Sequence, residues 1–158
     1  MAGIKIYRTG IRGAVELANR LAKARDKNEA LRMALSEGDI EAMGRLLQEG
    51  ADVNAARGEF NTTVLMEAAV RGDIEALRLL IENGANVNAV DKDGWSALMG
   101  ATVQGHMESA KLLLEQGAEV NAKNHNGETA LFMSTKMNHT EIRDVLLEHG
   151  AKNDNDLR

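Results

Sequence analysis

The chain contains no cysteine and no proline, and only 3% of its 158 residues are aromatic. The absence of cysteine excludes disulfide bonds and metal sites built on thiolates. With so few aromatic side chains, the core must consist of leucine, alanine, isoleucine, valine and methionine, which suits thin layers of close-packed helices. No apolar run approaches the roughly 20 residues that a membrane-spanning helix needs, and no signal-peptide core follows Met1. We therefore expect a cytoplasmic protein without a membrane partner, with the nucleus as the alternative location.

Charge is distributed unevenly along the chain. Residues 1–27 carry seven basic and two acidic side chains, whereas residues 28–158 carry twelve basic and 22 acidic ones, which together give the net charge of −5. Binding of nucleic acid needs a basic face, so the acidic body of the chain argues against a nucleic-acid partner.

A short motif, Gly-Ala-x-Val-Asn-Ala, occurs three times, at 50–55, 84–89 and 117–122, and a further Gly-Ala pair begins at Gly150. The glycines lie 34, 33 and 33 residues apart. A fixed period of this length indicates a solenoid, in which each unit buries its apolar face by stacking on its neighbours.

Each unit predicts two short helices. The first helices are expected to begin after Glu29, Thr63, Ser96 and Thr129 and to end at Gly38, Gly72, Gly105 and Asn138. Their core faces carry Leu31, Leu65, Leu98 and Leu131, with Ala34, Ala68, Ala101 and Ser134 three residues further on. The second helices begin near Asp39, Asp73, His106 and His139 and carry the pairs Leu46-Leu47, Leu79-Leu80, Leu112-Leu113 and Leu146-Leu147.

This pattern resembles the ankyrin repeat over about residues 28–153. The resemblance implies an all-α solenoid of four helix–turn–helix units with short β-hairpin fingers, with repeats at about 28–57, 58–90, 91–123 and 124–153 in a domain spanning 28–158. One departure is consistent: the Thr-Pro-Leu-His of the family reads Thr-Val-Leu-Met, Ser-Ala-Leu-Met and Thr-Ala-Leu-Phe, beginning at Thr63, Ser96 and Thr129. We expect Met66, Met99 and Phe132 to replace the missing histidine by packing.

The segment before the repeats predicts an amphipathic helix over residues 11–25. Its apolar stripe consists of Ile11, Ala14, Val15, Ala18, Leu21 and Ala22. We favour a helix that caps the first repeat. A partner-binding or dimerising arm and an organelle-targeting segment are the alternatives, so the expected state is a monomer, with a dimer through this helix as the other reading.

No pattern in the chain supports catalysis, a metal site or a cofactor. The four histidines include no pair spaced for zinc, and His106 and His139 occupy equivalent repeat positions, which indicates structural residues. The run Asp91-Lys92-Asp93-Gly94 lacks the later ligands of a calcium loop and predicts a hairpin turn. We therefore expect no enzymatic activity and no bound cofactor.

The ankyrin resemblance implies that a protein or peptide binds across the fingers and the exposed face of the first helices. The residues carried over to that surface are Phe60, Val70, Arg71, Lys92, Trp95, Val103, Gln104, His125 and Lys136. Aromatic and arginine side chains there are the usual anchors of an interface. Two other readings are open: a sensor that stacks a nucleotide or small molecule on Trp95 beside Lys92, and an engineered scaffold without a natural partner.

Overall fold

The computed structural model describes residues 10–23 and 26–153. Residues 24 and 25 of the helix expected over 11–25, and the basic residues before Gly10, lie outside the described residues. The chain divides into two compact units, Met1–Asp52 and Val53–Arg158. Each unit is described by itself below.

The first unit contains three described helices, namely α1 (Gly10–Lys23), α2 (Lys27–Glu37) and α3 (Ile40–Gln48). The expected start of α2 after Glu29 is wrong by three residues. Asp26 is the N-cap, because its carboxylate accepts a hydrogen bond from the Glu29 N–H at 2.7 Å. An aspartate outside the repeat pattern therefore sets the start of the helix.

Helix α1 lies beside α2 within this unit. The apolar stripe that we expected to pack on the first repeat is exposed at every position whose side chain is described: Ala14, Val15, Ala18 and Ala22. Val15 is 56% exposed. The approach of α1 to α2 therefore does not depend on burial of these four side chains.

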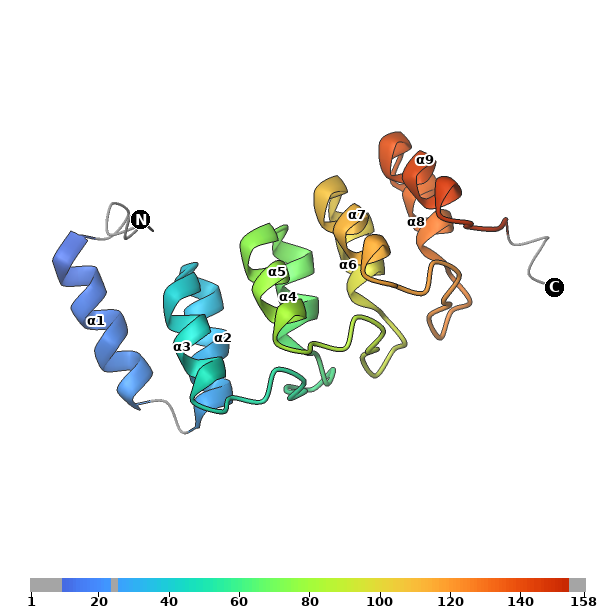
Figure 1. Ribbon diagram of the computed structural model, residues 1–158. Helices are drawn as coiled ribbons and strands as arrows, with labels where there is room; N and C mark the ends of the chain where they lie inside the picture. Colours follow the sequence, from blue (N-terminus) through green and yellow to red (C-terminus); the bar gives the residue numbers. More distant parts are fainter. Residues whose placement is uncertain (1–9, 24–25, 154–158) are drawn as a thin grey trace. The chain divides into compact units, whose positions relative to one another are not determined.

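The second unit is a row of three helix pairs (Figure 1). The pairs are α4 (Val64–Arg71) with α5 (Ile74–Glu82), α6 (Ala97–Gln104) with α7 (Met107–Glu115), and α8 (Ala130–Lys136) with α9 (Thr140–Glu148). The first helices α4, α6 and α8 pack on one another in order, and the second helices α5, α7 and α9 do the same. The unit is therefore an all-α solenoid, as the sequence predicts.

The predicted starts of the three first helices and the predicted ends of α4 and α6 are confirmed by their caps, whereas α8 ends one residue earlier than predicted, with Met137 as its C-cap. The hydroxyls of Thr63, Ser96 and Thr129 each accept a hydrogen bond from the backbone N–H three residues later. At the other end, Gly72 and Gly105 adopt left-handed backbone conformations. These local signals alone are sufficient to locate the first helices.

The predicted core is largely confirmed. Every leucine and every small residue on the core face of the first helices is buried, from Leu31 and Ala34 to Leu131 and Ser134. The leucine pairs of the second helices are buried to different degrees. Leu80, Leu113 and Leu146 are completely buried, whereas Leu147 is 45% exposed.

The asparagine of the repeated motif links each turn to the next one. The Asn88 side chain donates to the Gly117 carbonyl at 3.0 Å and accepts from the Glu119 N–H at 2.7 Å. Asn54 and Asn121 make the same two bonds to the turns that follow them. These backbone groups belong to irregular turns, so the asparagines satisfy polar groups that the helices leave unpaired.

We predict that Asn88→Ala lowers the free energy of unfolding by about 2 kcal/mol, since it removes two hydrogen bonds of about 1 kcal/mol each. Urea denaturation followed by circular dichroism measures the change. Asn126→Ala, at an exposed position on a finger, is the control and should cost less than about 0.5 kcal/mol. Equal losses from the two substitutions would contradict a structural role for the asparagine bridge.

A buried hydroxyl in α7 provides a second prediction. Ser109 is 1% exposed, and among the described side chains its oxygen is the one buried polar atom without a hydrogen-bond partner. The equivalent residues in the two preceding repeats are Ala42 and Ala76, which are also buried. We expect Ser109→Ala to raise the unfolding free energy by about 1 kcal/mol, because it removes an unpaired polar group. A lower thermal midpoint would contradict this account.

Candidate functional site

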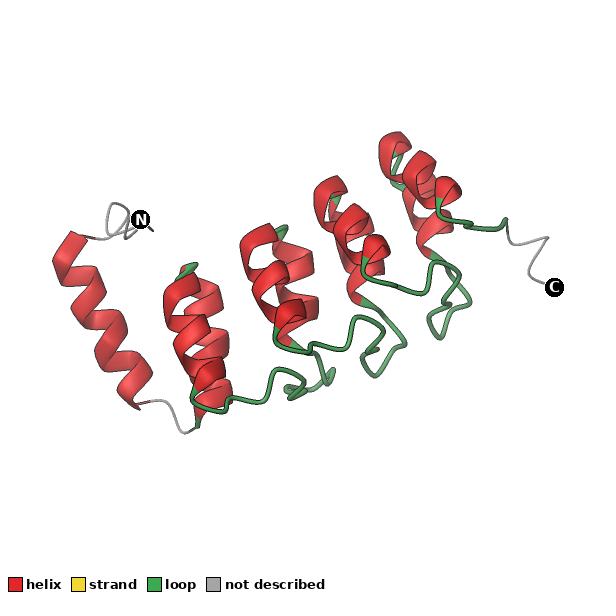
Figure 2. Ribbon diagram, viewed as in Figure 1, coloured by secondary structure: helices red, strands yellow, loops and turns green. Residues whose placement is uncertain are grey.

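Three finger loops precede the first helices of the second unit (Figure 2, green). The expected β-hairpins are reduced to isolated antiparallel bridges, Arg57 with Thr62 and Val90 with Ser96. Within the part of the chain that the structure describes, no longer strand forms. The fingers are therefore shaped by turns and side-chain hydrogen bonds more than by sheet pairing.

One side chain organises each of the second and third fingers. The Asp91 carboxylate accepts from the N–H groups of Asp93 at 2.9 Å and of Trp95 at 2.8 Å. One period later, the Asn124 amide oxygen accepts from the N–H groups of Asn126 at 3.0 Å and of Glu128 at 2.9 Å. Aspartate and asparagine therefore hold the same turn, with and without a negative charge.

The first finger, which lies in the 34-residue period, differs from the other two. It lacks the turn aspartate and is closed by reciprocal backbone bonds between Arg57 and Thr62, each 2.9 Å long. Asn61, in the turn, has a φ of 60°, which asparagine tolerates better than most residues.

Neighbouring fingers are joined at their tips by backbone hydrogen bonds. The Lys92 N–H donates to the Phe60 carbonyl, and the His125 N–H donates to the Asp93 carbonyl, each at 2.9 Å. The side chains of Phe60, Lys92 and His125 are all exposed. These three predicted binding residues therefore project from a connected row of fingertips.

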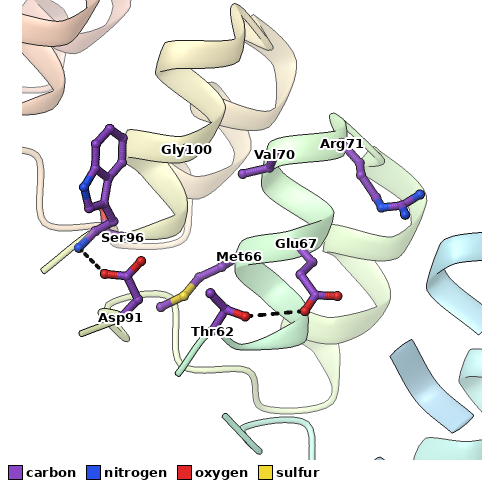
Figure 3. Close-up of a pocket in the computed structure, with 9 residues that line it drawn as sticks. Thr62, Met66, Glu67, Val70, Arg71, Asp91, Ser96 and Gly100 are labelled. Carbon is purple, nitrogen blue, oxygen red and sulfur yellow. Dashed lines mark hydrogen bonds between the residues drawn. The ribbon is translucent and has the colours of Figure 1, made fainter. Parts of the chain in front are cut away.

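A groove of about 380 Å³ lies between the second and third repeats, along α4, α6 and the second finger (Figure 3). Its lining residues are Thr62, Met66, Glu67, Val70, Arg71, Asp91, Trp95, Ser96 and Gly100. In Figure 3, Met66 and Val70 extend from α4 toward the side of Gly100, whereas Arg71 extends to the opposite side of its helix. The side of α4 toward Gly100 is therefore apolar, and the charged residues of the lining are Glu67, Arg71 and Asp91.

Gly100 lets α4 and α6 approach each other closely at one point beside the groove. A Cβ atom at this position would lie 2.9 Å from the Val70 Cγ2 atom. The equivalent residue of the next repeat is Met133, whose side chain is buried. At this position α8 therefore carries a buried methionine side chain, whereas α6 carries no side chain.

The structure brings some of the predicted residues together and separates others. Val70, Arg71 and Trp95 line the groove. Val70 is exposed, at 44%. Val103, one period later, is less exposed and does not line the groove. Gln104 is exposed at the end of α6, and Lys136 is exposed at the end of α8.

The two histidines predicted to be structural are confirmed as such. His106 Nε2 donates to the Val70 carbonyl at 3.0 Å, and His139 Nε2 donates to the Val103 carbonyl at 3.1 Å. The His106 ring lies so close to Gly72 that a Cβ there would be 2.6 Å from Nδ1. Each ring therefore packs on a helix-ending glycine of the preceding repeat and links two repeats.

The expected packing of the residues that replace the family histidine is confirmed for two of three. Met66 and Met99 are buried, but Phe132 is 40% exposed, so the expectation is wrong for Phe132. The Lys136 ammonium lies 5.7 Å from the centre of the Phe132 ring. The aromatic ring is therefore partly exposed and lies near a cation of its own helix.

Sequence reasoning missed Met66, Glu67, Asp91 and Gly100 as residues of the site. The signal was a difference within the repeat: position 100 carries glycine where the next repeat has Met133. A glycine in the middle of a short helix is costly, which marks it as a residue needing explanation. Asp91 was interpreted only as a turn residue, although it also lines the groove.

Metal-binding groups and membrane-spanning helices are two further features that bear on function. No group of three or more histidine, aspartate or glutamate side chains in the described ranges could hold a metal ion. None of the helices described is both long and apolar enough to cross a membrane.

Comparison with known proteins identifies a family. A model described as ankyrin repeats in three copies matches residues 31–124 and, in a second register, residues 65–156. No curated protein matches the chain. Members of this family are generally protein–protein interaction modules and are typically not catalytic.

The shared turn chemistry of Asp91 and Asn124 gives a test of the second finger. We predict that Asp91→Asn leaves the unfolding free energy within about 0.5 kcal/mol of the wild type, because an amide oxygen accepts the same two bonds. Asp91→Ala should cost about 1–2 kcal/mol by removing both bonds. Thermal and urea melts of the two variants measure the difference. An equally large loss in both would show that the charge itself stabilises the finger.

Proposed function

Since the chain belongs to the ankyrin repeat family, we propose that it is a non-catalytic binding module that holds a protein segment in the groove between its second and third repeats. The fingertips beside the groove extend the same surface. The observation that carries this proposal is the groove of about 380 Å³, whose lining includes Met66, Val70 and Trp95.

The composition of the groove suits a protein ligand. Met66, Val70 and Trp95 give it an apolar lining, and Phe60 is exposed on the adjoining fingertip. Interfaces combine an apolar centre, often aromatic, with a polar edge. Here Thr62, Glu67 and Asp91 provide the polar edge.

The charges of the groove favour a protein ligand over a nucleotide. Trp95 lines the groove, as the nucleotide reading requires, but Lys92 does not. The charged residues of the lining are two carboxylates, of Glu67 and Asp91, and one cation, of Arg71. Since carboxylates repel phosphate groups and outnumber the cation, the lining favours a protein ligand.

We predict that peptides selected from a random display library on the wild-type protein include binders that need the groove. For these, Trp95→Ala should weaken binding about 30-fold, which corresponds to about 2 kcal/mol for an aromatic anchor. Gly100→Met should abolish binding by placing in the groove the side chain that Met133 places in the next repeat. Fluorescence anisotropy with labelled peptides gives both affinities.

Phe132→Ala is the matched control, because it removes an exposed aromatic that does not line the groove. Its affinity should equal that of the wild type, and the circular dichroism melts of all three variants should show folded protein. Selected peptides that bind the Gly100→Met protein as tightly as the wild type would place the binding surface elsewhere.

A further inference from the structure

We infer that the groove receives one long, unbranched basic side chain, lysine or arginine, from the bound segment. This inference rests on the proposed function and concerns the same site. Three observations carry it: the side chain that the next repeat holds at the equivalent seam, the charges along the groove, and the tryptophan in its lining.

Comparison of successive repeats shows what shape of side chain fits between two first helices. Residues 100 and 133 occupy the same position in successive repeats. Met133 is buried at 3% exposure, and the residue equivalent to Val70 beside it, Val103, is less exposed than Val70. At the seam between α6 and α8, the position equivalent to Gly100 therefore holds a side chain that is long and unbranched, and the groove beside α4 and α6 has room for such a side chain from a ligand. Lysine and arginine have an aliphatic stem of this kind.

The charges of the groove select a basic end group. Glu67 and Asp91 both line it, and Asp91 is held in place by the turn of the second finger. Arg71 is the basic residue of the lining, and it extends away from the side of Gly100 (Figure 3). The wider surface agrees, since residues 28–158 carry 22 acidic and twelve basic side chains.

The aromatic wall suits the same ligand. Trp95 is half-buried, and its backbone is fixed by hydrogen bonds to Asp91. The face of an indole ring attracts a cation and packs well on an aliphatic stem. The stem would therefore lie against Met66, Val70 and Trp95, with its charged end toward the carboxylate of Asp91.

Short synthetic peptides test this inference without knowledge of the natural partner. The probes are acetylated and amidated Ala-Ala-X-Ala-Ala, where X is lysine, norleucine or glutamate. Norleucine matches the lysine stem without its charge. Since Trp95 is the single tryptophan of the chain, one indole N–H signal in the ¹H–¹⁵N NMR spectrum reports occupancy of the groove.

We expect the lysine peptide to shift this signal saturably and to bind about fivefold more tightly than the norleucine peptide, as one partly exposed ion pair allows. The glutamate peptide should bind more weakly than both. Asp91→Asn, which keeps the turn, should reduce the preference of lysine over norleucine to less than about twofold, and Gly100→Met should abolish the saturable shift.

Two results would overturn the inference. If norleucine binds as tightly as lysine, the groove selects an apolar side chain and its carboxylates have no part in recognition. If no probe produces a saturable shift, the groove does not bind a single basic side chain. In either case, groove-dependent peptides from the display selection would leave the proposed function standing, whereas their absence would contradict the proposed function separately.

Discussion

The bridge that each motif asparagine makes to the following turn is the contact on which the second unit depends. Helices satisfy their own backbone groups, but the turns between repeats cannot. Asn54, Asn88 and Asn121 solve this problem by accepting from one N–H and donating to one carbonyl of the next turn. Each bridge therefore ties the turn after one repeat to the turn after the next, alongside the buried leucines and alanines that join the helices.

The first unit reaches a related arrangement with different residues. The Asn28 side chain, in the first turn of α2, accepts from the Asp52 N–H at 2.7 Å, which is the group that the motif asparagine binds in later repeats. Lys27 donates to the Glu49 carbonyl nearby. These two contacts come from residues immediately after the N-cap Asp26. The early start of α2 therefore places both side chains where they can satisfy the turn after α3.

The parts of the fold that the sequence predicts well are those governed by local rules repeated in register. Caps such as Thr63, helix-ending glycines such as Gly72, and the buried leucines each depend on a few neighbouring residues, and agreement among the repeats removes chance matches. Phe132 was misjudged because its burial depends on what packs beside α8, which the period does not specify. The groove was missed for the same physical reason: residues of two successive repeats line it, among them Val70 and Gly100, and the period does not specify how they pack.

In a repeat array, the residues that break the period carry the specific information. Residues that keep it, such as the motif asparagines and the leucines of the first helices, hold neighbouring repeats together and are alike at every seam. A seam therefore differs from the others only where one repeat departs from the pattern. Gly100 is such a departure, and it costs helix stability, because glycine inside a helix is less favourable than alanine by about 1 kcal/mol. In return, the missing side chain lets Val70 lie against α6, because a Cβ atom at Gly100 would be 2.9 Å from the Val70 Cγ2 atom. The groove beside this contact, with a fixed tryptophan and a fixed carboxylate in its lining, is what a partner can use to distinguish this chain from a regular stack of the same repeats.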